Sequence, residues 1–336
     1  MARFFHQPRL MRTLLRLLAS LPVAIIGMGL ASGAPSPLSL QRPLPSRFAA
    51  NAPIGARTAA APVALPNIVA LLRTTAVSTD SITPALRIPL PHSLLIAPHG
   101  CASVGDRFDV LIHFHGAFTT VEPRLLESGI DGVYLVQNLG NGSGAYEDAY
   151  AGKGSLGAEL EVIRNALNQR CGGPARSIAR VALSGWSAGY GAIYRILARP
   201  AEAERVDAVL LADGMHVGYE PGSRRVRAAA MAPYLAFAAA SVRGERLMAV
   251  THSAIVPPGY ASTTATAEFL VRELALDPTP AVSPEPRPGM RATSSNARGG
   301  LSIEGFAGGD AHAHCDHLYA IGDTLWPQLR ERWAAK

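Results

Sequence analysis

Several signals are missing from this sequence of 336 residues, and each absence excludes a class of protein. Only three residues are cysteine, and none follows the apolar N-terminal segment as a lipid-attachment site would, so a lipoprotein is not expected. Charged residues make up 17% of the chain, and no basic stretch is interleaved with aromatic residues, which argues against nucleic-acid binding. No internal repeat divides the chain.

What is present at the N-terminus is the pattern of a secretory signal. Four arginines within the first sixteen residues precede an apolar core from Leu17 to Leu30, and Ala31-Ser32-Gly33 supplies small residues after it. We predict that residues 1–33 are a cleaved signal peptide and that the protein is exported, to the periplasm or the medium. The apolar core is short and contains Pro22, which argues against an uncleaved membrane anchor.

The charge and composition of the remaining chain indicate one folded domain. The formal net charge is +6, and the four arginines of the predicted signal contribute +4 of it, so the rest is near +2. The basic isoelectric point therefore gives no support for a nucleic-acid partner.

Residues 34–65 are rich in Ala, Pro and Ser and are predicted to be an extended tether. We expect a single domain over residues 66–336, long enough to bury a large core.

Apolar strands alternate with helical segments along this domain, for example Leu156–Gln169 and Thr264–Leu274. This alternation is typical of an α/β fold with a mostly parallel central sheet and helices on both faces. Residues 277–300 contain five prolines and are predicted to be an irregular insertion before the last strand.

The most informative motif is Gly185-Trp186-Ser187-Ala188-Gly189. It joins an apolar strand, Ser177 to Ser184, to a helical segment that begins at Tyr190. A G-x-S-x-G sequence between a strand and a helix is typical of the nucleophile elbow, in which a tight turn exposes the serine. We therefore predict that Ser187 is a catalytic nucleophile.

Two further strands end in residues that such a serine needs. The strand from Asp109 ends in His115-Gly116-Ala117, where the backbone N–H of Ala117 would pair with that of Ala188 to form an oxyanion hole. His115 is expected to shape this loop, and His113 to be a polar residue that completes the strand. The strand from Val206 ends in Asp213-Gly214, and a carboxylate there can orient a histidine base.

Three histidines after the last predicted strand, Leu301–Phe306, are candidates for that base. We assign His317, because it adjoins the predicted final helix, Leu318 to Trp333, whose first turn Asp316 is expected to cap. His314 is the alternative base, and His312 is a third candidate.

In these residues the chain resembles the α/β-hydrolase superfamily of serine esterases. The order of oxyanion loop, serine elbow, acid and histidine agrees at Ala117, Ser187, Asp213 and His317, and the resemblance spans roughly residues 85–336. It implies the α/β-hydrolase fold for the domain. The acid lies one strand earlier than its commonest position in the superfamily.

The resemblance also implies a disulfide bond. In the sheet of that superfamily, the strands that follow Cys101 and Cys171 are parallel neighbours, so both cysteines would lie at the same edge. We expect a Cys101–Cys171 disulfide and a free thiol at Cys315.

The residues His312-x-His314-x-Asp316-His317 also match a metal-ligand pattern of metallo-β-lactamase-like hydrolases. Such a site needs further histidine ligands downstream, and no histidine follows His317. We therefore expect no metal.

These expectations together describe an exported serine hydrolase that cleaves a small or polymeric carboxylic ester. No cofactor, no nucleic-acid partner and no stable membrane insertion after signal cleavage are expected, and the oligomeric state stays open. The loop from Asn138 to Ser155, with Glu147 and Asp148, and the segment from Met215 to Tyr219 could form the pocket walls. No large apolar lid is visible, which argues against a true lipase.

Two alternative functions remain open. One is an amidase or peptidase with the same triad, because ester and amide cleavage share one constellation of residues. The other is a non-catalytic exported binding protein with the same fold.

Overall fold

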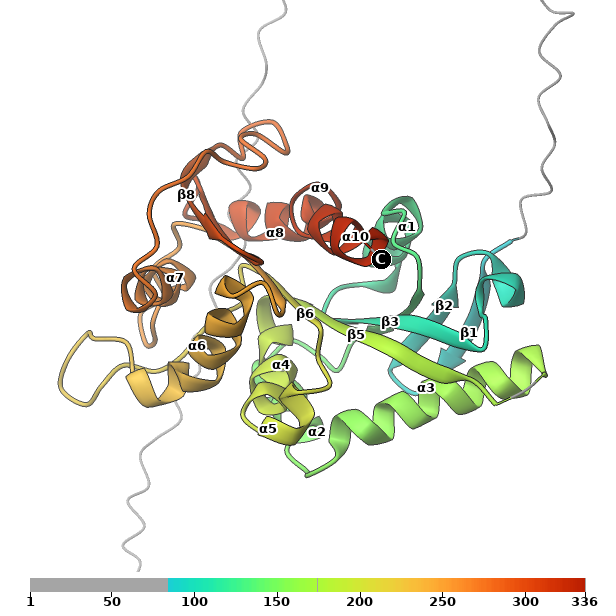
Figure 1. Cartoon of the computed structure of the whole chain (residues 1–336). Coiled ribbons are helices and arrows are strands. Elements are labelled where there is room, and N and C mark those ends of the chain that lie inside the picture. The colour runs from blue at the N-terminus through green and yellow to red at the C-terminus, as the bar shows by residue number, and fades with distance from the viewer. Residues whose placement is uncertain (1–83, 174, 336) are drawn as a thin grey trace, which may run out of the picture. The chain divides into compact units, whose positions relative to one another are not determined.

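The computed structural model describes residues 84–173 and 175–335, all within one compact unit, Ala76–Lys336 (Figure 1). The predicted signal peptide and tether lie outside the described residues. Within the described part, no helix combines the length and apolar character that crossing a membrane requires.

The described residues form one mixed sheet with helices between its strands. The strands are β1 (Leu86–Leu90), β2 (Ser93–Ala97), β3 (Arg107–Phe114), β4 (Val133–Gln137), β5 (Ser177–Trp186), β6 (Ala208–Ala212), β7 (Leu247–His252), β8 (Ala292–Arg298) and β9 (Leu301–Phe306). The α-helices are α1 (Phe118–Glu127), α2 (Ser143–Ala149), α3 (Ser155–Cys171), α4 (Tyr190–Leu197), α5 (Pro200–Ala203), α6 (Ala228–Val242), α7 (Thr263–Glu273), α8 (Ala311–Tyr319), α9 (Ile321–Thr324) and α10 (Trp326–Ala334). Two 3₁₀ turns are η2 (Gly100–Ser103) and η3 (Ser187–Gly189).

The sheet has the strand order β1-β2-β4-β3-β5-β6-β7-β9-β8. The pairings from β4 through β3, β5, β6 and β7 to β9 are parallel, whereas β1–β2, β2–β4 and β8–β9 are antiparallel. The parallel strands end at one edge of the sheet, so the segments that follow β3, β5, β6, β7 and β9 meet there.

Two hydrophobic layers hold the sheet between helices. Along β3, Val110 and Ile112 belong to the core on one face and Leu111 to the core on the other, as the two-residue period of a strand requires. The first core includes residues of α3, α4 and α6, and the second includes residues of α1, α8 and α10. Figure 1 shows these two groups of helices on opposite sides of the sheet.

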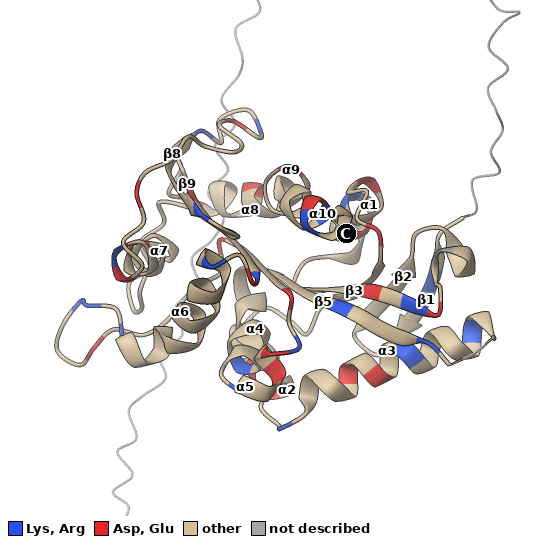
Figure 2. Cartoon of the chain, viewed as in Figure 1, with Lys and Arg blue, Asp and Glu red and all other residues tan. Residues whose placement is uncertain are grey.

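A disulfide bond between Cys101 and Cys171 joins η2 to the end of α3, with the two Cα atoms 5.4 Å apart. This pairing confirms the expected one, and Cys315 has a free thiol. Acidic and basic residues are interspersed over the helices and strand ends (Figure 2). Several of these charged residues form ion pairs within the fold, for example Arg180 with Asp109 and Arg332 with Asp207.

Two predicted boundaries are wrong. Residues 277–300 were expected to be irregular, but they contain β8, which pairs antiparallel with β9. The final helix was expected to begin at Leu318, but α8 begins at Ala311. Its N-cap is Asp310, whose side chain accepts a hydrogen bond from the backbone N–H of Ala313 at 2.9 Å. Asp316, the expected cap, lies inside this helix.

Candidate active site

Ser187 lies in a tight turn between β5 and α4, where the sequence predicted an elbow. Its φ of 48° is in the left-handed region, which is uncommon for a residue other than glycine. The turn presses against β3: a Cβ atom at Gly189 would lie 2.2 Å from the carbonyl oxygen of Phe114. Only glycine fits at that position, so the second glycine of the motif is required by the close approach of the turn to β3.

Asp213 occupies the corresponding turn at the end of the neighbouring strand, β6. Trp186 pairs with Ala212 in the sheet, so Ser187 and Asp213 each come one residue after the last pair. Asp213 also has a left-handed φ, 43°. A Cβ atom at Gly214 would lie 2.6 Å from the backbone oxygen of Ser187. The two turns are therefore in direct contact.

The carboxylate of Asp213 is 2% exposed and accepts three hydrogen bonds. Its Oδ1 accepts from the backbone N–H of Ser253 at 2.9 Å and from the hydroxyl of Thr263 at 2.6 Å. Its Oδ2 accepts from Nδ1 of His314 at 2.6 Å. Burial alone would raise the pKa of Asp213, but these donors and the nearby His317 outweigh it and hold the pKa well below its usual range. The group is therefore an anion at neutral pH.

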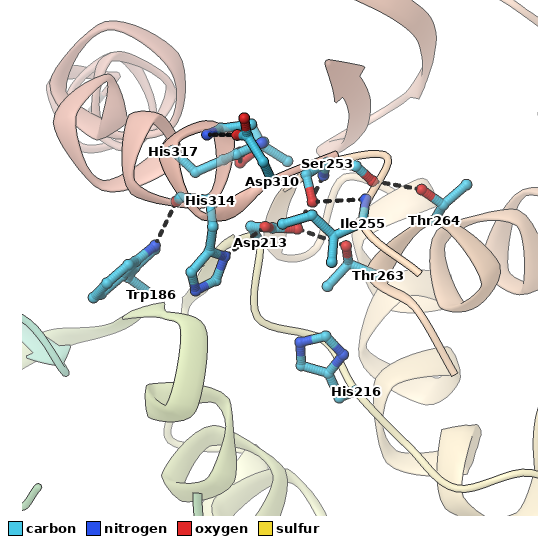
Figure 3. Close-up of polar contacts among 12 residues, drawn as sticks. Trp186, Asp213, His216, Ser253, Ile255, Thr263, Thr264, Asp310, His314 and His317 are labelled. Atoms are coloured by element: carbon cyan, nitrogen blue, oxygen red, sulfur yellow. Dashed lines mark hydrogen bonds and ion pairs between the residues drawn. The ribbon is translucent and has the colours of Figure 1, made fainter. Parts of the chain in front are cut away.

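His314 is the histidine that contacts this anion. It lies in the first turn of α8, and its position is fixed at a second point, because Nε1 of Trp186 donates a hydrogen bond to its carbonyl oxygen at 2.9 Å (Figure 3). Since the carboxylate can only accept, Nδ1 of His314 carries the proton and Nε2 is free to act as a base.

His317, the base assigned from the sequence, is in a different environment. Its side chain is 1% exposed, and Nδ1 is hydrogen-bonded to the hydroxyl of Thr251 at 2.8 Å. Burial lowers its pKa to about 4. The structure therefore favours the alternative base, His314. His312 is 83% exposed and pairs with Asp316 at 3.1 Å.

The sequence contained a signal for where this helix begins, although not for which histidine contacts Asp213. Asp310 is followed by residues that continue as a helix, and a helix that starts at Ala311 places His314 on its first turn, close to the strand ends. A helix predicted to begin only at Leu318 leaves His314 outside it, whereas in the structure His314 lies within α8.

The expected oxyanion loop follows β3 and lies beside the elbow. His115 and Gly116 have positive φ values, 72° and 128°, and Ala117 is the N-cap residue of α1. Ala188 lies in η3, at the start of the next helical segment. Backbone N–H groups at helix starts lack a carbonyl partner within the helix, so both are suited to hold an anionic oxygen.

The two histidines of this segment have structural contacts. The ring of His115 stacks on that of Trp186 at 5.0 Å, and its Nδ1 is hydrogen-bonded to the hydroxyl of Tyr146. His113 is fully buried, with Nδ1 hydrogen-bonded to Ser184 and Nε2 donating to the carbonyl of His115. Burial lowers the pKa of His113 to about 3 and also lowers that of His115. Both are thus neutral at pH 7.

Two pockets open beside Ser187. The larger, of about 510 Å³, is lined by Ala188, by residues of α2 and α4, and by His216, Val217 and Gly218. The smaller, of about 320 Å³, is lined by Asp213, His314 and residues of the segments after β7 and β9. Ser187, His216 and Tyr260 line both. Parts of the two expected walls, 138–155 and 215–219, thus line the larger pocket.

The residues of the H-x-H-x-D-H pattern point to different partners. His314 contacts Asp213, His317 contacts Thr251, and His312 contacts Asp316. In the described part of the chain, no three His, Cys, Asp or Glu residues are grouped as metal ligands.

Comparisons with known proteins give only distant similarities. No protein-family model and no curated protein matches the sequence. Among solved structures, the chain is similar to an arylesterase, at a TM-score of 0.36 and 10% identity over 74% of this chain and 84% of the other. It is also similar to the carboxylesterase CesB of Bacillus subtilis, at a TM-score of 0.28 and 10% identity over 57% of this chain and 82% of the other. A third similar structure is a histone deacetylase from Saccharomyces cerevisiae, at a TM-score of 0.26 and 10% identity over 51% of this chain and 75% of the other. Similarities this weak carry no information on activity.

Proposed function

We propose that the protein is an exported serine hydrolase of the α/β-hydrolase superfamily that cleaves carboxylic esters. The observation that carries this proposal is the 2.6 Å hydrogen bond between His314 and the buried anion of Asp213, beside the elbow serine Ser187. The acid, the base and the nucleophile of such an enzyme need this proximity and protonation state.

The sheet supports the superfamily assignment. Its parallel strands run in the order β4-β3-β5-β6-β7-β9, and the proposed functional groups follow β3, β5, β6 and β9 at one edge. The proposed acid, Asp213, follows β6, the strand directly after the elbow strand in the sequence.

The proposed reaction has two stages. In the first, Oγ of Ser187 attacks the carbonyl carbon and its proton passes to Nε2 of His314. Asp213 stabilises the imidazolium, and the N–H groups of Ala117 and Ala188 hold the oxyanion. The C–O bond of the ester then breaks, and the leaving alcohol takes the proton from His314. In this proposal His314 takes the role first assigned to His317.

In the second stage, water attacks the acyl-enzyme and gives its proton to His314. The bond to Oγ breaks, the proton returns to Ser187 and the carboxylic acid leaves. Side chains and water handle every proton in this cycle, so the proposal invokes no metal or organic cofactor.

A fluorophosphonate probe tests the proposal, because it reacts with an activated serine. We expect labelling of the wild-type protein and of Ser177→Ala, which changes an exposed serine at the start of β5, and none of Ser187→Ala. Hydrolysis of p-nitrophenyl acetate should follow the same pattern, and Ser187→Ala should lower kcat for this ester by several orders of magnitude. A folded wild-type protein that neither reacts nor hydrolyses would favour the non-catalytic alternative.

Two further measurements address the remaining expectations. Faster turnover of aminoacyl p-nitroanilides than of p-nitrophenyl acyl esters would favour the amidase alternative. A carboxylate in the larger pocket, Glu147, is paired with Arg195 at 3.0 Å, which reduces its capacity to bind a cationic substrate group.

N-terminal sequencing of the secreted protein should find a start at Ala34 if residues 1–33 are removed.

A further inference from the structure

The two pockets beside Ser187 have different relations to the proposed chemistry. His314 and Asp213 line only the smaller pocket, whereas Ala188 lines only the larger one. The leaving oxygen must receive its proton from His314, so the alcohol part of the substrate faces the smaller pocket. The acyl part then extends into the larger pocket, past the N–H group of Ala188. This assignment rests on the proposed function.

The larger pocket is lined by aromatic rings. Tyr190 and Tyr194 lie one turn apart on α4, which begins three residues after Ser187, and therefore share a face of the helix. The ring of His216 contacts those of Tyr190 and Tyr260 edge to face, at centroid distances of 5.4 and 5.0 Å. Such walls bind a flat ring by stacking and edge contacts.

Aliphatic side chains are scarce in the same pocket. Among its lining residues only Val217 is a large aliphatic, and the other apolar groups are Ala188 and Ala230. A long alkyl chain would find few methyl or methylene groups to contact. The volume of about 510 Å³ is within the range of pockets that hold a small molecule.

The polar groups of this wall suit an uncharged substituent on the ring. Nδ1 of His216 donates to the carbonyl oxygen of Ala261 at 3.2 Å, so its Nε2 is an acceptor. Tyr190 donates to Ser143, which donates to Glu147, and Arg195 neutralises that carboxylate. Within the described residues, no side-chain hydrogen bond ties the hydroxyl of Tyr194 or Tyr260.

We propose that the acyl group of the substrate is an aromatic carboxylic acid with a hydroxyl substituent on its ring, as in hydroxybenzoyl and hydroxycinnamoyl esters. The ring lies among Tyr190, Tyr194 and Tyr260. Its hydroxyl donates to Nε2 of His216 or exchanges hydrogen bonds with the tyrosine hydroxyls. The alcohol leaves on the side of His314.

Methyl esters test the proposal, because they keep the leaving group constant and small. We expect kcat/KM for methyl para-hydroxycinnamate or methyl para-hydroxybenzoate to exceed that for methyl hexanoate by about tenfold or more, the scale of one good ring contact. Tyr194→Ala should reduce this ratio at least fivefold. The control Tyr319→Ala removes a tyrosine of α8 outside both pockets and should leave the ratio unchanged.

A binding measurement separates this proposal from the proposed function. In Ser187→Ala, para-hydroxycinnamate should raise the melting temperature and hexanoate should not, whether or not the enzyme is active. If the protein hydrolyses p-nitrophenyl acetate through Ser187 but prefers methyl hexanoate to methyl para-hydroxycinnamate, the acyl assignment is wrong and the hydrolase proposal stands. If it neither hydrolyses esters nor binds para-hydroxycinnamate, both proposals are wrong.

Discussion

The indole of Trp186 connects the elbow to the residue proposed as the base. Its Nε1 donates to the carbonyl oxygen of His314 at 2.9 Å, and the two rings lie 4.9 Å apart with their planes tilted by 31°. The indole also stacks on the ring of His115, with the ring centroids 5.0 Å apart. Trp186, the first of the two x positions of the G-x-S-x-G motif, thus contacts both the expected oxyanion loop and α8.

Replacing Trp186 should impair catalysis through the placement of His314. Trp186→Leu removes both the ring contact and the hydrogen bond to α8, and we expect kcat to fall by about 10²-fold, the cost of a small displacement of a reacting group. Trp186→Phe keeps a ring and should retain more of the activity. Steady-state kinetics of the two variants check this, with urea unfolding as the measure of an intact fold. Equal activity in Trp186→Leu and wild type would contradict the positioning role.

The two histidines of α8 should respond in opposite ways to substitution. His314→Ala removes the partner of Asp213 and should lower kcat by 10³-fold or more while the fold remains. His317→Ala removes a buried side chain bonded to Thr251 and should lower the free energy of unfolding by about 2 kcal/mol, with a much smaller loss of kcat. Activity assays and urea unfolding of both variants measure these effects. An inactive but fully stable His317→Ala, beside an active His314→Ala, would restore the assignment made from the sequence.

Acid should destabilise the protein through its buried histidines. Burial lowers the pKa of His113 to about 3 and that of His317 to about 4, from 6.5 in an unfolded chain. Below pH 6.5 the unfolded chain takes up protons that the folded one excludes, so stability falls as the pH decreases. Between pH 6.5 and pH 4 the loss should be about 3 kcal/mol for each histidine.

Unfolding by urea across this pH range tests the prediction. His317→Asn should reduce the slope of the unfolding free energy by about 1.4 kcal/mol per pH unit. The control Thr251→Val removes the same hydrogen bond without removing a titrating group, so it should lower stability at every pH and leave the slope unchanged. An unchanged slope in His317→Asn would show that His317 does not titrate in this way.

The disulfide should stabilise the domain without affecting the proposed reaction. Cys101 and Cys171 are 70 residues apart, and closing a loop of that length contributes about 4 kcal/mol in the chain-entropy model. Cys101 precedes β3 and Cys171 precedes β5, whereas Ser187 follows β5. The double variant Cys101→Ser/Cys171→Ser should therefore unfold at a lower urea concentration and retain wild-type kcat at 25 °C. A large loss of kcat in the folded double variant would contradict this.

Short sequence patterns correctly predicted the turns that follow three of the apolar strands. The elbow at Ser187, the turn at Asp213 and the loop at Ala117 each follow an apolar strand, and the structure has turns at all three. The disulfide followed from the expected order of parallel strands. The strand β8 was missed because its sequence, ATSSNAR, is polar, and its pairing with β9 decides its conformation.

The histidine assignment depended on a helix boundary, which short-range patterns determine least well. His314 and His317 are three residues apart, and only the packing of α8 decides which one contacts Asp213. The partners that identify each histidine, Trp186 for His314 and Thr251 for His317, come from distant parts of the sequence. No pattern near residue 314 contains that information.

The direct contact between the turns of Ser187 and Asp213 has a consequence for the order in which the site is assembled. Ser187 and Asp213, the proposed nucleophile and acid, come into contact when β6 pairs with β5. His314 can reach Asp213 only when β9 has joined the sheet and α8 has packed beside it, about 100 residues further along the chain. A chain whose C-terminal part has not yet folded would therefore contain the proposed nucleophile without its proposed base. Such a chain would be catalytically silent until its C-terminal part folds, and recovery of ester hydrolysis during refolding would report on that last docking step.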